Sequence, residues 1–408
     1  MIRINSLVLV IITIFLTQPL FADMWNHRNL LVGERGAMMG GAYTALSEDI
    51  SGAFYNPGGL GFISKPALSL TTNIYGYRNW DLNTYDSRGV DNIQFERFEL
   101  IPGTLGISFN LSENLVLAYS IIQSDTIKFD GSITSQRKVE TMSINFDSFL
   151  TGPSLAYKIS DKLAVGVSVF YHYFQGKFTS FRDEVSFSGV PGARSTVRQE
   201  NQATSGGITS VLGFKWNVTN EFKLGLSYGS ETIHTNGTST GSRVDNDTFY
   251  GPSPIETSSG EGDVRLPHRV ALGLAYDVKN KFTVSVDVLY NFELDYPYPY
   301  HRFDPLNPNS RHYEKGQFNL SVGGEAFISK SFALRAGFFT NRSTAAEEWQ
   351  NFEVDIYGGA FGIGYVKDGL SSGIGVNVSY GSEDSSPFMH WKRLEISIII
   401  GGTVLFGS

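Results

Sequence analysis

Few residues in this 408-residue sequence are arranged for catalysis. The run GLSYG at residues 225–229 fits the G-x-S-x-G pattern of serine hydrolases, but it lies within a strand-like segment. A nucleophilic serine of that class sits on a sharp strand-to-helix turn, which this segment does not offer. The seven histidines show no metal-ligand spacing such as H-E-x-x-H, and there is no phosphate-binding P-loop. The sequence therefore predicts no enzyme, no metal site and no cofactor.

Residues suited to binding a hydrophobic molecule are easier to find. The run DYPYPYHRF at residues 295–303 concentrates aromatic rings and prolines. These rings could capture a greasy ligand, or they could form a stiffened loop or an interfacial aromatic belt. Two arginines could hold a ligand carboxylate, or they could form internal ion pairs, because unpaired buried charges are costly. The candidate ligand-binding residues are Tyr296, Tyr298, Tyr300, Phe303, Arg269 and Arg335, together with apolar residues of the 181–196 loop.

The segments that must position these residues alternate apolar side chains with small or polar ones. In KLAVGVSVFYHYF (residues 162–174), Val165, Val167 and Val169 share one face, whereas Ala164 and Ser168 hold the other. A soluble sandwich would carry charged residues opposite its apolar face, but here the opposite face is largely Gly, Ala and Ser. Large apolar residues facing lipid, with small or polar residues facing a lumen, are typical of a transmembrane β-barrel. The predicted lumen face also carries Arg269, Arg335, Asp287, Glu293 and Glu325.

Fourteen such segments follow one another along the chain. Connections after even-numbered segments are short, such as KNK at 279–281, whereas three connections after odd-numbered segments are long and polar (181–196, 238–263 and 295–316). Short periplasmic turns alternating with long outer loops are typical of outer-membrane barrels. The sequence thus predicts an all-β, 14-stranded antiparallel transmembrane β-barrel over residues 66–408. Its strands are expected to start near Ala67, Phe95, Asn114, Val139, Lys162, Val197, Phe222, Val264, Lys281, Gln317, Phe332, Glu353, Ser371 and Lys392.

The first 65 residues do not join this pattern. Residues 1–22 have the charge, apolar run and small final residue of a secretory signal peptide, and the apolar run falls short of the ~20 residues of a spanning helix. Residues 23–65 are glycine-rich and lack a strand period. A barrel of this width needs something to fill its bore, so we expect residues 23–65 to form a hatch, meaning a plug inside the lumen. Within it, Asn56-Pro57-Gly58-Gly59 predicts a tight turn with Gly58 at positive φ.

Composition limits the compartment and the partners. The chain has 44 Gly, 30 Phe and 20 Tyr, which suits an exported all-β protein. Because there is no cysteine, disulfides and lipoprotein processing are excluded. A formal net charge of −8 argues against nucleic acid as a partner. The expected location is the outer membrane of a Gram-negative-type cell, where the barrel contacts outer-membrane lipid and is inserted by barrel-assembly machinery.

The stretch GERGAMMGGAYTALSEDISGAFYNPGGL (residues 33–60) resembles the N-terminal hatch of the FadL/TodX family of outer-membrane proteins. Further similarities run along the barrel, including IPGTLGISFNLSENLVLAYS from residue 101 and the FALRAGFF strand from residue 332. The resemblance covers nearly the whole mature chain and implies a 14-stranded barrel with an internal hatch. The residues that it implies for the hatch and its gating are Arg35, Gly40, Gly41, Glu48, Asp49, Asn56, Pro57 and Gly58.

The resemblance implies uptake of hydrophobic compounds such as long-chain fatty acids or aromatic hydrocarbons. The expected steps are capture on the extracellular loops, rearrangement of the hatch and lateral release into the membrane. In that family the third strand is kinked, whereas here residues 114–129 contain no Gly or Pro, and breakers fall at Pro102-Gly103 and Gly152-Pro153. The alternative function is a similar barrel that serves as an assembly or secretion-associated subunit, and a third is a leaky aqueous porin.

Overall fold

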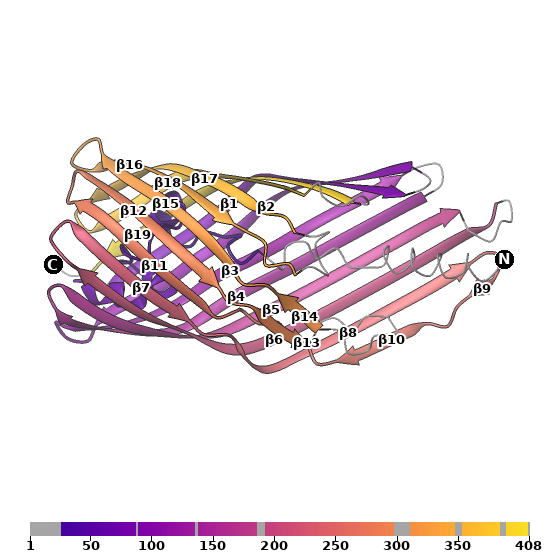
Figure 1. Ribbon diagram of the computed structural model, residues 1–408, viewed down its shortest axis with the longest axis horizontal. Helices are drawn as coiled ribbons and strands as arrows, with labels where there is room; N and C mark the ends of the chain where they lie inside the picture. The colour runs from indigo at the N-terminus through magenta and orange to yellow at the C-terminus, as the bar shows by residue number, and fades with distance from the viewer. Residues whose placement is uncertain are drawn as a thin grey trace.

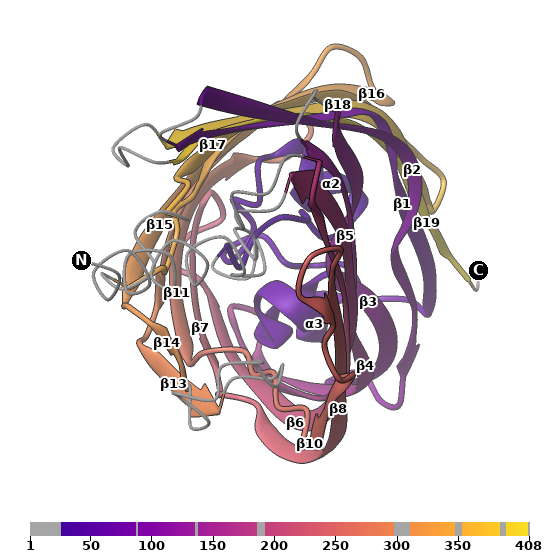
Figure 2. The ribbon, with the colours of Figure 1, turned by 90° about the vertical axis from the view of Figure 1, so that its right-hand side faces the viewer.

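The computed structural model describes residues 26–86, 89–134, 138–185, 192–297, 311–346, 353–383 and 389–406. The predicted signal peptide lies outside these ranges. The described chain forms a closed antiparallel barrel with an N-terminal segment inside it (Figures 1 and 2). The barrel closes where β1 (Ala67–Asp86) pairs with both β2 (Gly89–Asn110) and β19 (Met389–Leu405).

The remaining wall strands follow in sequence order around the barrel. They are β3 (Leu115–Thr134), β4 (Lys138–Ser160), β5 (Leu163–Val185), β6 (Arg194–Asn217), β7 (Phe222–Gly229), β8 (Ile233–Asp247), β10 (Glu256–Gly260), β11 (Arg269–Val278), β12 (Phe282–Asn291), β15 (Gln317–Phe327), β16 (Phe332–Asn341), β17 (Ile356–Lys367) and β18 (Leu370–Glu383). β7 and β8 both pair with β6, so they form one interrupted strand. β10 and β11 pair with β8 and β7 in turn and form the next one. With β9 (Gly251–Pro252) as a short tip segment, the wall has the predicted fourteen strands.

The predicted alternation of faces is present in the wall. On β5, Val165, Val169 and Tyr171 point outward and are exposed, whereas Ser168 and Phe170 point inward and are buried. Further along the strand, Gln175 and Lys177 replace the outward apolar residues. An outward apolar stretch that ends in aromatic and then polar residues is typical of the boundary of a membrane-facing band.

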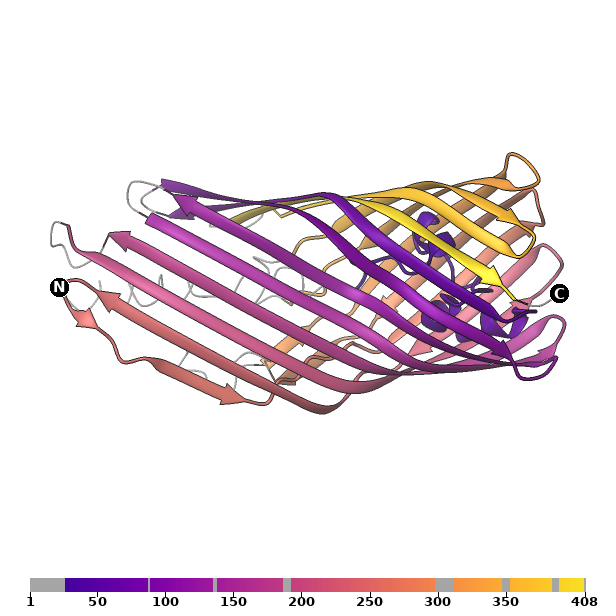
Figure 3. The ribbon, with the colours of Figure 1, turned by 180° about the vertical axis from the view of Figure 1, so that it is seen from behind.

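One side of the barrel is much taller than the other, which the sequence did not indicate. β4, β5 and β6 have 23, 23 and 24 residues, although about 9–11 residues suffice for a strand to cross a bilayer. These strands continue far beyond the ends of β11, β12 and β15 (Figures 1 and 3). The segments predicted as long loops are therefore largely strand extensions in their described parts, residues 181–185, 192–196 and 238–263. The 295–316 connection contains a separate hairpin, β13 (Leu294–Pro297) with β14 (Arg311–Glu314).

Three further sequence expectations about the wall are wrong. The strand expected to start near Val264 instead begins with β10 at Glu256, leaves the wall at residues 261–268 and resumes with β11 at Arg269. The second strand begins at Gly89, six positions before Phe95. Glu293 does not face the lumen, since β12 ends at Asn291 and Glu293 is exposed.

The third strand is irregular despite having no proline and no glycine at the point of change. The pairing of β3 with β4 shifts register between Gln123 and Asp125. The pairing of β3 with β2 stops at Phe95–Gly131 and resumes at Thr104–Ile122. Over the described residues between these points, the two strands form no backbone register pairs with each other. The wall is therefore weakened between β2 and β3, next to the predicted breaker at Pro102-Gly103.

The hatch occupies the lumen as predicted, near the end of the barrel that carries the short turns (Figures 1 and 2). It contains α2 (Glu34–Met38), α3 (Gly52–Tyr55) and the 3₁₀ helix η1 (Pro57–Phe62). None of the helices in the described ranges is both long enough and apolar enough to cross a membrane.

The predicted turn at Asn56–Gly59 is instead the beginning of η1. Asn56 is extended and its side chain accepts a hydrogen bond from the Gly58 N–H, while Pro57 occupies the first helical position. Gly58 does not adopt positive φ; within the hatch Gly33, Gly40 and Gly41 do. Gly58 is small for another reason: a Cβ there would lie 3.0 Å from the Gly213 carbonyl oxygen of the wall.

Candidate functional site

A buried charge network joins the beginning of the hatch to β15 and β16. Arg335 on β16 donates to Glu325 on β15 at 2.6 Å and also forms an ion pair with Glu34 of α2. Arg35 donates to both carboxylate oxygens of Glu325, at 2.8 and 3.2 Å. Arg335 and Glu325 are almost fully buried. Each buried charge thus has a partner of opposite sign, so the network holds the hatch against the wall.

A second charge network lies under the middle of the hatch. Glu48 accepts from Lys215 of β6 at 2.7 Å and from Lys223 of β7 at 3.2 Å. Lys223 also pairs with Asp277 of β11 at 2.7 Å. The neighbouring Asp49 accepts from the Tyr43 hydroxyl at 2.6 Å and thus braces the hatch internally. Of the acidic pair predicted at positions 48 and 49, the first residue therefore binds the wall and the second binds within the hatch.

Backbone groups of the hatch are also bonded directly to the wall. Asp287 on β12 accepts from the N–H groups of Tyr43 and Thr44 at 2.8 and 2.7 Å. Asn56 donates to the Phe214 carbonyl of β6 at 2.9 Å. Gly40, at φ 64°, presses on β16, where an added Cβ would lie 2.9 Å from the backbone of Phe338. Small residues let the two backbones approach so closely.

A cavity of about 90 Å³, hereafter the upper cavity, lies between the outer side of the hatch and the wall. Its polar lining includes His172, Thr209, Asp125 and Asp147. Its apolar lining comes from the hatch, from β3 to β6 and from residues that follow the β10 strand, namely Phe54, Ile127, Phe146, Leu150, Phe170, Phe174, Val211, Val264 and Leu266. A mostly apolar cavity with a few polar groups is typical of a site for a small hydrophobic ligand. An engineered apolar cavity of 150 Å³ binds benzene, so this cavity must widen to take a larger ligand.

The hairpin of β13 and β14 covers part of the upper cavity. Tyr296 lines the cavity and packs on His312, with ring centres 4.7 Å apart. Glu314 accepts from His312 Nε2 at 3.0 Å and contacts His27 Nε2 of the hatch at 2.5 Å. Burial alone would raise the pKa of Glu314, but His27 and His312 outweigh it and hold that pKa at about 2. Burial alone would lower the pKa of His27, but the Glu314 carboxylate outweighs it and raises that pKa.

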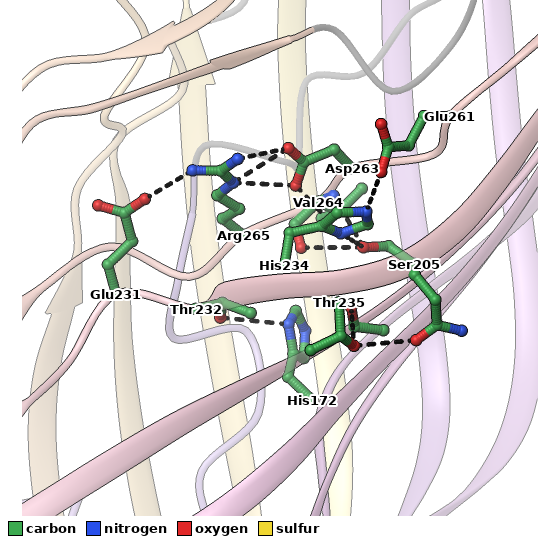
Figure 4. Close-up of polar contacts among 12 residues, drawn as sticks. His172, Ser205, Glu231, Thr232, His234, Thr235, Glu261, Asp263, Val264 and Arg265 are labelled. Atoms are coloured by element: carbon green, nitrogen blue, oxygen red, sulfur yellow. Dashed lines mark hydrogen bonds and ion pairs between the residues drawn. The ribbon is translucent and has the colours of Figure 1, made fainter.

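Residues 261–268, which interrupt the eighth wall strand, form another part of the cavity lining. Figure 4 shows Arg265 between two carboxylates, Asp263 at 2.7 Å and Glu231 at 3.1 Å. The Val264 N–H donates to the Ser205 hydroxyl of β6 at 3.0 Å. Because Ser205 faces the lumen, this bond draws the segment inward across the inner face of the wall.

Arg269, the first residue of β11, points into the lumen as predicted. Its guanidinium carbon lies 4.4 Å from the centre of the Phe54 ring, and its Nη2 donates to the Phe54 carbonyl at 3.1 Å. Within the described parts of the chain, Arg269 forms no ion pair with a carboxylate. It lines the upper cavity and also a second cavity of about 40 Å³, the lower cavity, which shares Phe54 with the upper one.

The structure therefore separates the two arginines that the sequence grouped together. Arg335 is enclosed by two carboxylates, whereas Arg269 faces the cavities and has no carboxylate partner among the residues that the structure describes. Tyr296 lines the upper cavity, while Tyr298, Tyr300 and Phe303 lie outside the described residues. The ligand-binding role of each of these residues stays a prediction.

Several residues of the site escaped the sequence reasoning. Lys215 could have been found, because it is a lysine on the lumen parity between Phe214 and Trp216. Glu34 and Phe54 gave no such signal, because the hatch has no strand period. Glu314 and His27 are 287 positions apart, and only the fold brings them together.

Comparison with known proteins agrees with this architecture. Residues 29–390 match the model of the family described as outer membrane protein transport protein (OMPP1/FadL/TodX). This chain belongs to that family. It is accordingly an outer-membrane β-barrel transport protein for hydrophobic compounds and not an enzyme.

Solved structures of the family share the fold at low sequence identity. A FadL homologue of Pseudomonas aeruginosa is 14% identical with a TM-score of 0.69, covering 94% of this chain and 100% of its own. The Pseudomonas putida toluene transporter TodX is 13% identical with a TM-score of 0.66, covering 93% of this chain and 100% of its own. The CymD monoaromatic hydrocarbon channel is 15% identical with a TM-score of 0.61, covering 93% and 99%. No curated protein sequence matches the chain.

Proposed function

We propose that this FadL/TodX-family barrel takes up a hydrophobic molecule by binding it in the upper cavity. The observation that carries the proposal is the position of that cavity. Its apolar lining connects the hatch, through Phe54, to the weakened wall strand β3, through Ile127. A ligand held there is shielded from water, and each buried methylene contributes about 0.8 kcal/mol.

Exit into the membrane between β2 and β3 completes the proposed path. Ser124, Thr126 and Ile127 line the cavity and belong to the part of β3, between Ile122 and Gly131, where the described backbone ladder with β2 has no register pairs. If β2 and β3 separate over this stretch, no described backbone pairing between them is broken. Lateral release would therefore require movement of side chains and of the hatch, but no rupture of that part of the ladder.

Arg269 favours a ligand with an acidic head group, such as a fatty acid, over a neutral hydrocarbon. A guanidinium without a carboxylate partner gains a charge-assisted hydrogen bond when a ligand carboxylate arrives. Such bonds contribute about 1.5–3 kcal/mol. We therefore expect a long-chain fatty acid to bind more tightly than its methyl ester.

Binding to the purified protein in detergent tests this function. Titration calorimetry with a long-chain fatty acid should give saturable binding, and Phe174→Ser should weaken it about tenfold, because a buried aromatic contact is lost. Val169→Ser is the matched control, since it changes an exposed residue on the outward face of the same strand that lines neither described cavity. If neither a fatty acid nor an aromatic hydrocarbon binds, or if Phe174→Ser has no effect, the upper cavity is not the site. Copurification of a secretion partner without ligand would favour the alternative function.

A further inference from the structure

Two cavities lie next to each other along the hatch, and a stacked pair of side chains belongs to the lining that they share. The upper and lower cavities share four lining residues, namely His27, Phe54, Arg269 and Leu289. The lower cavity continues between Leu31 and Gly41 of the hatch and Ala271 of β11. It thus extends the upper cavity along the β11–β12 side, away from the weakened β2–β3 boundary.

The stacked pair is Arg269 and Phe54. The guanidinium lies over the Phe54 ring and is also bonded to the Phe54 carbonyl, so one side chain fills the junction and ties it to α3. Neither cavity alone reaches the 150 Å³ that accommodates benzene in an apolar core. Displacement of this pair would join them into one elongated space.

The environment of Arg269 makes it easier to displace than Arg335. Arg335 has two carboxylate partners, whereas the charged neighbours of Arg269 include Arg28 and His27, whose like charges oppose it. Gly229 of β7 lies against its side chain, where a Cβ would come within 2.7 Å of Arg269 Cγ. The observed position of the Arg269 side chain therefore requires glycine at position 229.

We infer that the Arg269–Phe54 pair is a gate between the two cavities, opened by a ligand carboxylate. This inference rests on the function proposed above. A carboxylate in the upper cavity attracts the guanidinium away from the Phe54 ring and carbonyl, and the acyl chain then enters the lower cavity. A neutral hydrophobe lacks this attraction and stays in the upper cavity.

Photo-crosslinking tests the gate in the full-length barrel. A long-chain fatty acid carrying a diazirine and its methyl ester are bound to purified protein, illuminated, and the labelled peptides are identified by mass spectrometry. In the wild type we expect the acid to label both cavities and the ester to label the upper cavity alone. Arg269→Met and Gly229→Ala should each admit the ester to the lower cavity and raise the labelling of that cavity by the ester about tenfold. This factor is the lower end of the effect expected when a hydrogen bond to a charged group is lost.

Gly229→Ala makes the result independent of the charge, because it displaces Arg269 without removing it. Arg265→Gln is the matched control, since it removes another arginine of the upper cavity that lies away from the junction. Equal access of acid and ester to the lower cavity in the wild type would overturn the gate. The gate would also be overturned if the ester labelled the upper cavity but reached the lower cavity in neither Arg269→Met nor Gly229→Ala. If neither probe labels the upper cavity, the proposed function itself fails, and the gate with it.

Discussion

On its β15–β16 side the hatch is held by charges, whereas on its β3–β5 side it is held mainly by apolar packing, with one buried hydrogen bond from Ser168 to the Ala53 carbonyl. Arg335, Glu325 and Glu34 form fixed pairs on the first side. On the second side, Leu60 packs with Ile122, Leu150, Phe170 and other buried residues. The charge-assisted hydrogen bonds of these ion pairs are directional and weaken steeply when their geometry is lost, but apolar contacts are non-directional. The difference indicates that the hatch is anchored at one side and can slide at the other, where the upper cavity lies.

The largest effect should follow from breaking the anchor. Arg335→Met removes a positive charge that neutralises the buried carboxylates of Glu34 and Glu325. We expect this loss to cost about 3–5 kcal/mol in hatch stability. Amide hydrogen exchange of α2 should accelerate accordingly while the barrel strands stay protected. Arg342→Met is the control, because its pair with Asp355 is exposed and should contribute at most about 1 kcal/mol. Equal effects of the two variants would contradict the idea of an anchored side.

A smaller effect should follow from pushing the hatch away from the same side. An alanine Cβ at Gly337 of β16 would overlap the backbone of Met39 and Gly40. We expect Gly337→Ala to cost about 1–3 kcal/mol in hatch stability, as overpacking does. The control is Gly359→Ala on β17, where the nearest atom would lie 3.6 Å away. Thermal unfolding in detergent distinguishes the two variants. An unchanged unfolding temperature for Gly337→Ala would show that the contact is loose.

The apolar side should respond more weakly to a comparable change. Leu60→Val removes one methylene from the cluster on β3 to β5, at a cost of about 1 kcal/mol. Because neighbouring apolar groups can shift, the hatch should stay in place and exchange only slightly faster. Leu105→Val, on the outward face of β2, serves as the control. A cost as large as that of Arg335→Met would remove the distinction between the sides.

The smallest effect should be local and dependent on pH. Glu314, with its pKa lowered to about 2, stabilises the docked β13–β14 hairpin above its usual pKa and loses this contribution as the pH falls. His27, with its pKa raised, contributes below its usual pKa and loses this contribution as the pH rises through the folded value. The hairpin should therefore be best protected between about pH 5 and 6.5. Hydrogen exchange of residues 311–314 measures this, and Glu314→Gln should flatten the profile; an unchanged profile would exclude the pair as its cause.

The barrel could be predicted because the alternation of residue types along each strand shows which side chains face lipid and which face the lumen. The parity of Val165 against Ser168 or of Leu272 against Ala271 is set by the lipid on one side and the lumen on the other, and it needs no knowledge of neighbours. The same argument failed at Val264, because a strand that leaves the wall keeps an apolar sequence when it packs inside the lumen. It failed again at residues 181–196, because polar strand extensions beyond the membrane look like loops.

The site could be predicted only in part. Arg269 and Arg335 were both placed on the lumen face from their parity, but parity says nothing about which carboxylates lie opposite. Glu34 pairs with Arg335 across 301 positions, and Phe54 rather than an acidic residue meets Arg269. These pairings depend on how the hatch is seated.

By itself, the sequence determined a closed wall of fourteen strands and a glycine-rich segment to fill it, because alternation and turn residues act over a few neighbouring positions. Only the tertiary structure decided which arginine is neutralised and which faces the cavities. That choice arises from contacts between segments hundreds of residues apart, whose energies no local pattern records.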